Sequence, residues 1–152
     1  MKPKDVLLDR WAEVLARKGD LPAIFDTRGK VVRTFHEVDK HAQVVEADMR
    51  PAKPHTLYRL QIGNHADWPS LFLACLRAKR IVLPIDESVS PEQANSATAV
   101  AAKSETTEWG DESPTLFKLT SGTTALPRMI RFRSEQLLAD CDQICDTMGI
   151  TE

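Results

Sequence analysis

Four hydroxyl side chains surround a single glycine between two strand-like runs late in the sequence. The upstream run covers Thr115 to Leu119, and the downstream run covers Met129 to Arg133. Between them stand Thr120, Ser121, Gly122, Thr123 and Thr124, followed by Pro127 and Arg128. Glycine permits a sharp turn, successive N–H groups of a turn form a concave anion site, and hydroxyls are short donors. Strand, polar loop and strand therefore predict an oxyanion-binding loop.

A polyphosphate, such as the tail of a nucleotide, is the ligand that suits this loop. Arg128 adds a positive charge with a forked donor geometry. The spacing differs from that of the GxxxxGK[ST] phosphate loop and of the GxGxxG dinucleotide loop. A Ser/Thr-rich surface turn without a ligand is the alternative explanation of the same residues.

The composition is that of a globular protein of about one domain. The 152 residues are 42% hydrophobic, enough for a real core, and 28% charged, with a formal net charge of −2. This balance indicates neither a nucleic-acid partner nor a membrane partner. The N-terminus lacks the apolar region of a signal peptide, and no apolar run approaches the ~18 residues of a membrane span. We expect a cytoplasmic protein.

Cysteines and histidines give no metal or catalytic pattern. The three cysteines are Cys75, Cys141 and Cys145. An odd number argues against a disulfide framework, and no further ligands stand at zinc-finger spacing, so we interpret all three as small apolar residues. The four scattered histidines suggest no catalytic pair.

The first third of the sequence predicts a helix, a hairpin and a second helix. Helical spacing covers Asp5 to Lys18 with Gly19 as C-cap, and Trp11 is expected to anchor the core. Short strand-like runs at 23–26 and 31–35 flank the turn Asp26–Lys30. Thr34 to Glu37 matches a capping box that opens a helix running to about Met49.

A strand, a helix and a strand follow over residues 55–86. The strands are expected at 56–62 and 81–85, and the helix at 67–79 with Asp67 as N-cap. So short a span requires a parallel βαβ unit.

Two more helices complete the pattern. Ser90 and Gln93 form a second capping box, and residues 103–114, including the isolated Trp109, form a polar loop. Ser134 is expected to cap a last helix that ends at Met148 before Gly149. Its inward face is predicted to carry Leu137, Leu138, Cys141, Ile144, Cys145 and Met148. The fold class is α/β: a mostly parallel sheet flanked by helices, with an N-terminal hairpin, as a single unit over 1–152.

Several of these motifs resemble the adenylate-forming superfamily of acyl-CoA synthetases, adenylation domains and luciferases. The loop Thr-Ser-Gly-Thr-Thr-x-x-Pro-Arg is similar to the family's phosphate loop, with Ala125, Arg128 and Met129 where Gly, Lys and Gly are usual. Further matches, in the same order as in the family, are Gly63-Asn64, the run from Phe72 to Ala78 and Val-Leu-Pro-Ile-Asp at 82–86. The resemblance covers nearly the whole chain and the opening portion of the family pattern.

The resemblance implies an N-terminal fragment of the family's large domain, in a compact variant. The parent would activate a carboxylic acid with ATP and Mg²⁺ to an acyl-adenylate, then pass it to CoA or to the phosphopantetheine arm of an acyl carrier protein. The β- and γ-phosphates would be held by Thr120, Ser121, Gly122, Thr123 and Thr124, with Arg128 in place of the usual lysine. The fragment alone is expected to be inactive.

Two other classes of function stay open. One is an interaction module that uses the α/β scaffold to bind a partner protein. The other is a nucleotide- or phosphate-binding protein without chemistry. In a truncated chain, exposed apolar surface would also favour a dimer.

Overall fold

The fold is an α/β layer structure, described by a computed structural model for residues 5–50, 52–103, 113–120 and 128–150. In chain order the elements are α1 (Val6–Lys18), β1 (Pro22–Phe25), β2 (Val31–Thr34), α2 (Phe35–Met49), β3 (Leu57–Leu60), α3 (Trp68–Arg77), β4 (Ile81–Pro84), α4 (Pro91–Ala102), β5 (Leu116–Thr120), β6 (Arg128–Phe132) and α5 (Ser134–Met148). Within these residues, none of the helices has the length and apolarity that crossing a membrane requires.

The main sheet has the strand order β3-β4-β5-β6. β3, β4 and β5 run parallel, with Leu57 opposite Ile81 and Val82 opposite Leu116, whereas β6 is antiparallel to β5. β1 and β2 form a separate antiparallel hairpin. The predicted fold class, a mostly parallel sheet with an N-terminal hairpin, is confirmed.

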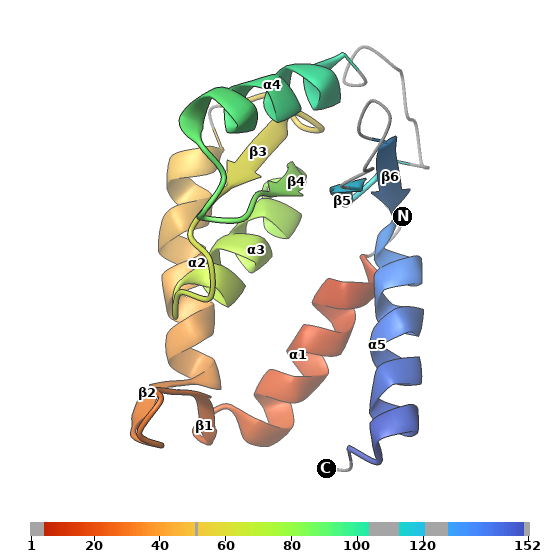
Figure 1. The fold of residues 1–152 in the computed structure, drawn as a ribbon. Coiled ribbons are helices and arrows are strands. Elements are labelled where there is room, and N and C mark those ends of the chain that lie inside the picture. The colour runs from red at the N-terminus through yellow and green to blue at the C-terminus, as the bar shows by residue number, and fades with distance from the viewer. Residues whose placement is uncertain (1–4, 51, 104–112, 121–127, 151–152) are drawn as a thin grey trace.

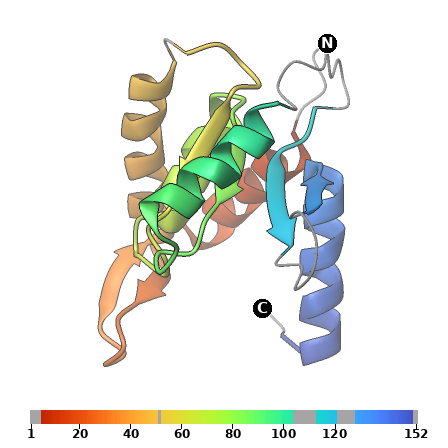
Figure 2. The same cartoon turned by 45° about the horizontal axis from the view of Figure 1, so that its top comes forward.

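Helices cover both faces of the sheet at β3 and β4. Figures 1 and 2 show α4 across one face and α3 on the other. The strands alternate accordingly: Val82 packs with Leu60 and the α3 residue Cys75, whereas Ile81 and Leu83 pack toward Ala101 of α4 and Phe117 of β5.

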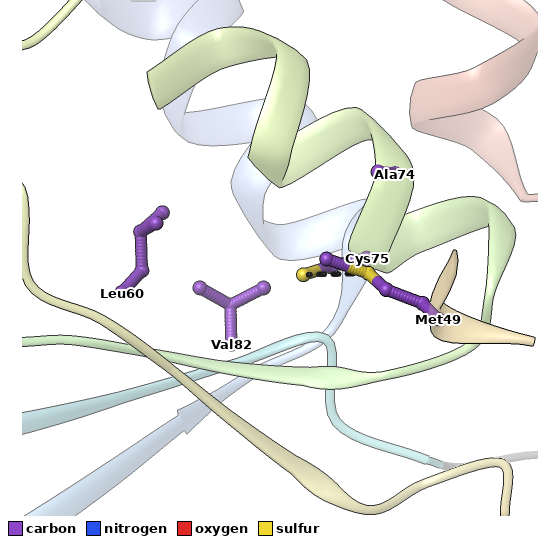
Figure 3. Packing of buried hydrophobic residues seen from close by; sticks show 5 residues of the cluster. All are labelled: Met49, Leu60, Ala74, Cys75 and Val82. Atoms are coloured by element: carbon purple, nitrogen blue, oxygen red, sulfur yellow. Dashed lines mark hydrogen bonds between the residues drawn. The ribbon is translucent and has the colours of Figure 1, made fainter. Parts of the chain in front are cut away.

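The first of these clusters encloses a buried thiol. Figure 3 shows Cys75 beside Met49, with their sulfur atoms 3.9 Å apart, over Leu60 and Val82. Burial raises the pKa of the Cys75 thiol to about 12, and Arg80 offsets only part of that effect. Cys75 is therefore a small apolar core residue, as expected from the sequence.

A buried carboxylate joins the first three helices. Asp39 of α2 accepts a hydrogen bond from Trp11 Nε1 of α1 at 2.6 Å and another from Gln43 Nε2 at 2.7 Å, and it forms an ion pair with Arg77 of α3. Burial would raise the pKa of Asp39, but the hydrogen bonds it accepts and the charge of Arg77 outweigh burial, so its pKa lies below the ordinary value. Trp11 thus packs against the core, as expected, and also donates a hydrogen bond to Asp39.

Local capping signals in the N-terminal half agree with the sequence. Thr34 Oγ1 accepts from Glu37 N–H, and the Glu37 carboxylate accepts from Thr34 N–H at 2.8 Å. Gly19 is the C-cap of α1, but its φ of −49° is right-handed. An added Cβ at this glycine would lie 2.2 Å from the His36 ring, so the exposed His36 side chain would have to shift.

The start of α5 differs from the prediction. The N-cap is Arg133, and Ser134 is the first helical residue. The buried Ser134 hydroxyl lies 2.8 Å from Thr115 Oγ1 and donates to Asp5 Oδ2 at 2.6 Å. The hydroxyl therefore joins β5 to the start of α1 and does not cap its own helix. Gly149 ends α5 with a left-handed φ of 63°, as predicted.

The predicted inward face of α5 is wrong for three of its six residues. Leu137, Leu138 and Cys145 are half-buried, whereas Cys141, Ile144 and Met148 are exposed. The reason is that α1 packs along one flank of α5, and α1 cannot cover the whole apolar stripe.

Asp39→Asn is expected to lower the free energy of unfolding by about 3 kcal/mol, because the largely buried Arg77 loses its counter-ion. Urea unfolding at neutral pH measures the change. The matched control is Asp48→Asn, an exposed position on the same helix, with an expected effect within about 0.5 kcal/mol.

Acid provides an independent check of the same interaction. Because the pKa of Asp39 is lowered by folding, its stabilisation is present above the unfolded pKa and is lost as pH falls through the folded pKa. The stability difference between the wild-type protein and Asp39→Asn should therefore shrink in acid. A difference that is independent of pH would contradict an ionised Asp39 at this site.

Candidate functional site

The candidate site lies at the carboxyl edge of the parallel strands. β3, β4 and β5 point the same way, so the segments that follow Leu60, Pro84 and Thr120 leave the sheet at one edge. In open α/β sheets this edge is where ligands bind. The sequence-predicted loop is the segment that follows β5, so topology alone brings it to this edge.

The structure holds the two ends of that loop against each other. Thr120 ends β5, Arg128 begins β6, and the two are paired in the antiparallel register. The strand–loop–strand layout expected around the loop is therefore present. Ser121, Gly122, Thr123 and Thr124, like Trp109, lie outside the described residues.

The segments after β3 and β4 are tied together next to this loop. Gln61 donates from Nε2 to the carbonyl oxygens of Asp86 and Val89, at 3.2 and 3.0 Å. The Asp86 carboxylate accepts from the hydroxyl and the N–H of Ser88, and these bonds hold its pKa below the ordinary value. Asp86 is thus an exposed, ionised carboxylate at the site edge.

Gly63 and Glu87 meet at the same edge. Gly63 has φ of 54°, and an added Cβ would lie 2.6 Å from the Glu87 carboxyl group. Gly63 therefore serves two needs, a left-handed turn and the close approach of a side chain.

A shallow hollow of about 410 Å³ opens where β3 leads into α3. It is lined by Gly63, Asn64, His65, Trp68 and Pro69. Trp68 stacks on Phe72 with ring centroids 5.3 Å apart, which fixes one wall.

Asp67, at the start of α3, is held by one arginine and two histidines. It occupies the N-cap position but makes no side-chain capping bond, in contrast to the prediction. Its carboxylate pairs instead with Arg33 of β2 and lies 3.6 and 3.5 Å from the Nδ1 atoms of His41 and His65. Burial would raise the pKa of Asp67, but Arg33 and the two histidines outweigh it and lower the pKa. The cluster docks the hairpin onto the α2–α3 pair.

Sequence reasoning did not identify the polar groups that accompany the loop. Gln61, Asp86 and Glu87 are ordinary polar residues in the sequence, but Gln61 directly follows β3, and Asp86 and Glu87 stand two and three residues after β4. The signal that could have identified them is their position just after the carboxyl ends of the strands in the predicted βαβ unit. Among the described residues, no three His, Cys, Asp or Glu side chains are grouped to hold a metal ion.

Comparisons with solved structures identify the fold. A fatty acid AMP ligase from Legionella pneumophila matches with a TM-score of 0.75 and 17% identity, over 96% of this chain and 33% of that chain. VinN in complex with 3-methylaspartate matches with a TM-score of 0.69 and 15% identity, over 93% and 51%. The N-terminal subdomain of Klebsiella oxytoca NpsA, bound to 3-hydroxyanthranilyl-AMSN, matches with a TM-score of 0.65 and 16% identity, over 83% and 40%.

The chain therefore has the fold of the N-terminal part of an adenylate-forming enzyme, and the resemblance predicted from its motifs is confirmed at this level. It spans about half the length of VinN and a third of the Legionella ligase. No protein-family model matches the sequence, and no curated protein is significantly similar to it.

Gly63→Ala is expected to lower the free energy of unfolding by about 1–2 kcal/mol through its left-handed backbone, and further because Glu87 must move. Gly29→Ala is the matched control: its φ is 78°, but an added Cβ meets no atom within 4 Å. Urea unfolding should show a larger loss for Gly63→Ala, and adding Glu87→Ala should remove the excess. Equal losses without this rescue would show that the Glu87 carboxyl group moves away from the added Cβ at little cost.

Proposed function

We propose that this chain is part of an adenylate-forming ligase and that the loop after β5 binds the β- and γ-phosphates of ATP. The observation that carries the proposal is the position of the Thr-Ser-Gly-Thr-Thr-x-x-Pro-Arg sequence. It joins β5 to β6 at the carboxyl edge of a sheet whose fold is that of acyl-AMP ligases.

The chemistry of the loop suits a polyphosphate. Hydroxyl groups of Thr120, Ser121, Thr123 and Thr124 and the N–H groups around Gly122 are donors, whereas phosphate oxygens are acceptors. Arg128 contributes a fixed positive charge, because a guanidinium stays protonated at any relevant pH. In this proposal the pairing of Thr120 with Arg128 keeps both ends of the loop together when its donors turn toward the ligand.

The reaction proposed for the complete enzyme is the activation of a carboxylic acid. The carboxylate attacks the α-phosphorus of ATP, pyrophosphate leaves, and an acyl-adenylate is formed. In this step the loop orients the β- and γ-phosphates and neutralises charge that develops on the leaving group. Magnesium would supply further charge neutralisation, and we assign none of its ligands to this chain. ATP as co-substrate fits the expected cytoplasmic location.

A thiol would then attack the acyl carbonyl carbon, the bond to the adenylate phosphate would break, and a thioester and AMP would be formed. CoA and the phosphopantetheine arm of a carrier protein offer the same nucleophile, and either completes an acid–thiol ligase. The acyl adenylate and pyrophosphate bound to the Legionella ligase support the first half-reaction for this fold, and that support reaches this chain only through its structural likeness.

The chain by itself is proposed to bind ATP without activating an acid. In-line attack needs the acid, the α-phosphate and further cations in one place, and this chain supplies the phosphate loop only. ATP–pyrophosphate exchange by the 152-residue protein should therefore be absent against a panel of fatty, aryl and amino acids. Acid-dependent exchange would overturn this part of the proposal.

Arg128→Ala is expected to weaken the binding of Mg²⁺-ATP by about tenfold to a hundredfold, since a charge-assisted hydrogen bond is lost. Calorimetric titration of the 152-residue protein measures the dissociation constant. The matched control is Arg131→Ala, three residues further along the same strand.

Three results of this titration are informative. A selective loss in Arg128→Ala supports the phosphate site, and the same loss for both variants indicates a general effect of positive charge. No ATP binding by the wild-type chain, in a protein whose unfolding is cooperative, would refute a phosphate site in this chain.

A further inference from the structure

Two histidines lie beside the Asp67 carboxylate, and both use Nδ1 as a hydrogen-bond acceptor. His41 of α2 has its Nδ1 atom 3.1 Å from Nη1 of Arg33. His65, in the segment before α3, has its Nδ1 atom 3.2 Å from the backbone nitrogen of Asp67. A guanidinium and a backbone N–H can donate but cannot accept, so neither Nδ1 atom carries a proton in this arrangement. Both rings are therefore neutral, with the proton on Nε2.

An acceptor for the protonated form of each ring is already in place. His41 Nδ1 lies 3.6 Å from Asp67 Oδ1, and His65 Nδ1 lies 3.5 Å from Oδ2 of the same carboxylate. These distances exceed an ordinary hydrogen bond, so each ring has to turn slightly before an Nδ1–H can reach Asp67. Burial would raise the pKa of Asp67, but the hydrogen bond and the charge of Arg33 outweigh burial and lower it. Asp67 thus stays ionised and able to accept.

Arg33 is the residue that loses most when the rings take up protons. In the neutral arrangement its guanidinium donates to His41 Nδ1, to the Ala66 carbonyl oxygen at 3.3 Å and to the Asp67 carboxylate. We call Arg33, His41, His65 and Asp67 the Asp67 cluster. Protonation of both histidines adds two positive charges to this cluster and turns one acceptor of Arg33 into a donor. Two cations then compete with Arg33 for a single carboxylate.

The charged surroundings of the two rings come from four elements. Among the described residues, Arg33 from the hairpin and Asp67 from the start of α3 are in hydrogen-bond or ion-pair contact with the rings. On α2, Glu37 lies one turn before His41, and its carboxylate already accepts the N–H of the N-cap residue. From the segment after β4, Glu87 lies over the turn that joins β3 to α3. The response of the rings to pH therefore centres on Arg33 and Asp67.

We propose that the Asp67 cluster is a pH-sensitive switch that controls how the β1–β2 hairpin is docked on the start of α3. At neutral pH both rings accept hydrogen bonds, and Arg33 holds the end of β2 to Asp67. In weak acid both rings are charged, turn their Nδ1–H groups to Asp67 and displace Arg33. Histidine suits this role because its charge ordinarily changes between pH 5 and 8.

The switch acts at the edge of the candidate site. His65 lines the hollow that opens where β3 leads into α3, so the same protons alter the segment that leaves β3 at the carboxyl edge. The inference rests on contacts within this chain and does not depend on ATP binding.

The tautomers of the two histidines test the neutral arrangement. In long-range proton–nitrogen correlation spectra of the 152-residue protein at about pH 8, His41 and His65 should each show an unprotonated Nδ1 and a protonated Nε2. A protonated Nδ1 on either ring would overturn the proposal, because that ring could not accept the hydrogen bond assigned to it.

Native-state hydrogen exchange tests the switch itself. Between about pH 8 and pH 5, protection of the hairpin amides should fall about tenfold or more, whereas protection at Leu73, in the core of α3, should be retained. The double variant His41→Asn/His65→Asn keeps an acceptor near each Nδ1 position and cannot titrate, so its hairpin should stay protected at pH 5. His36→Asn is the matched control: this histidine pairs with Asp20, outside the cluster, and its loss should leave the acid response unchanged.

Arg33→Gln provides a second test that does not need the double variant to fold. It removes the cation that the protonated rings displace, so hairpin protection should be low at both pH values. An acid response that persists in Arg33→Gln or in the double variant would exclude the proposed switch. An equal loss of protection in the hairpin and in α3 would assign the response to unfolding of the whole chain, and no loss in the wild-type hairpin would show that Arg33 is not displaced. Either result would overturn the proposal.

Discussion

The Asp39 carboxylate is the interaction on which the helical half of the molecule depends. Burying a charge costs several kcal/mol unless it is paired and hydrogen-bonded, and here the compensation comes from three helices at once. Trp11 donates from α1, Gln43 from α2, and Arg77 pairs from α3. No two of these helices can slide without leaving a buried polar group unsatisfied. The apolar residues around them, such as Val38 and Leu73, bury these polar groups. They do not fix how the three helices are aligned with one another.

The position of α3 is fixed, and this helix in turn positions part of the candidate site. Arg77 lies in the last turn of α3, and Asp67 lies at its start, so the helix is fixed at both ends by an ion pair. The ion pair with Asp67 brings the hairpin residue Arg33 to the start of α3. The carboxyl edge is thus built on a rigid helix, while its polar groups stand on short connections. This division suits binding sites, because rigid elements position residues that loops present.

The other half of the molecule depends on a hydroxyl group. Ser134 contacts both Thr115 and Asp5, so the start of β5, the start of α5 and the start of α1 meet at one buried point. The proposed phosphate loop is connected to α5 near this point, since only Arg133 separates β6 from α5.

Much of this protein was determined by local sequence. Capping boxes at Thr34 and Ser90, the left-handed Gly149 and the apolar spacing of the βαβ unit act within a few residues, so they could be predicted without the fold. Three features could not be. Asp67 took an ion pair in place of a cap, Ser134 joined other elements in place of capping α5, and half of the predicted apolar face of α5 stayed exposed. The partners of Asp67 and Ser134 lie far away in the chain. The exposed half of the α5 face has no covering element among the described residues. Amphipathic spacing indicates which face of a helix can be buried, but only tertiary packing decides whether another element covers it.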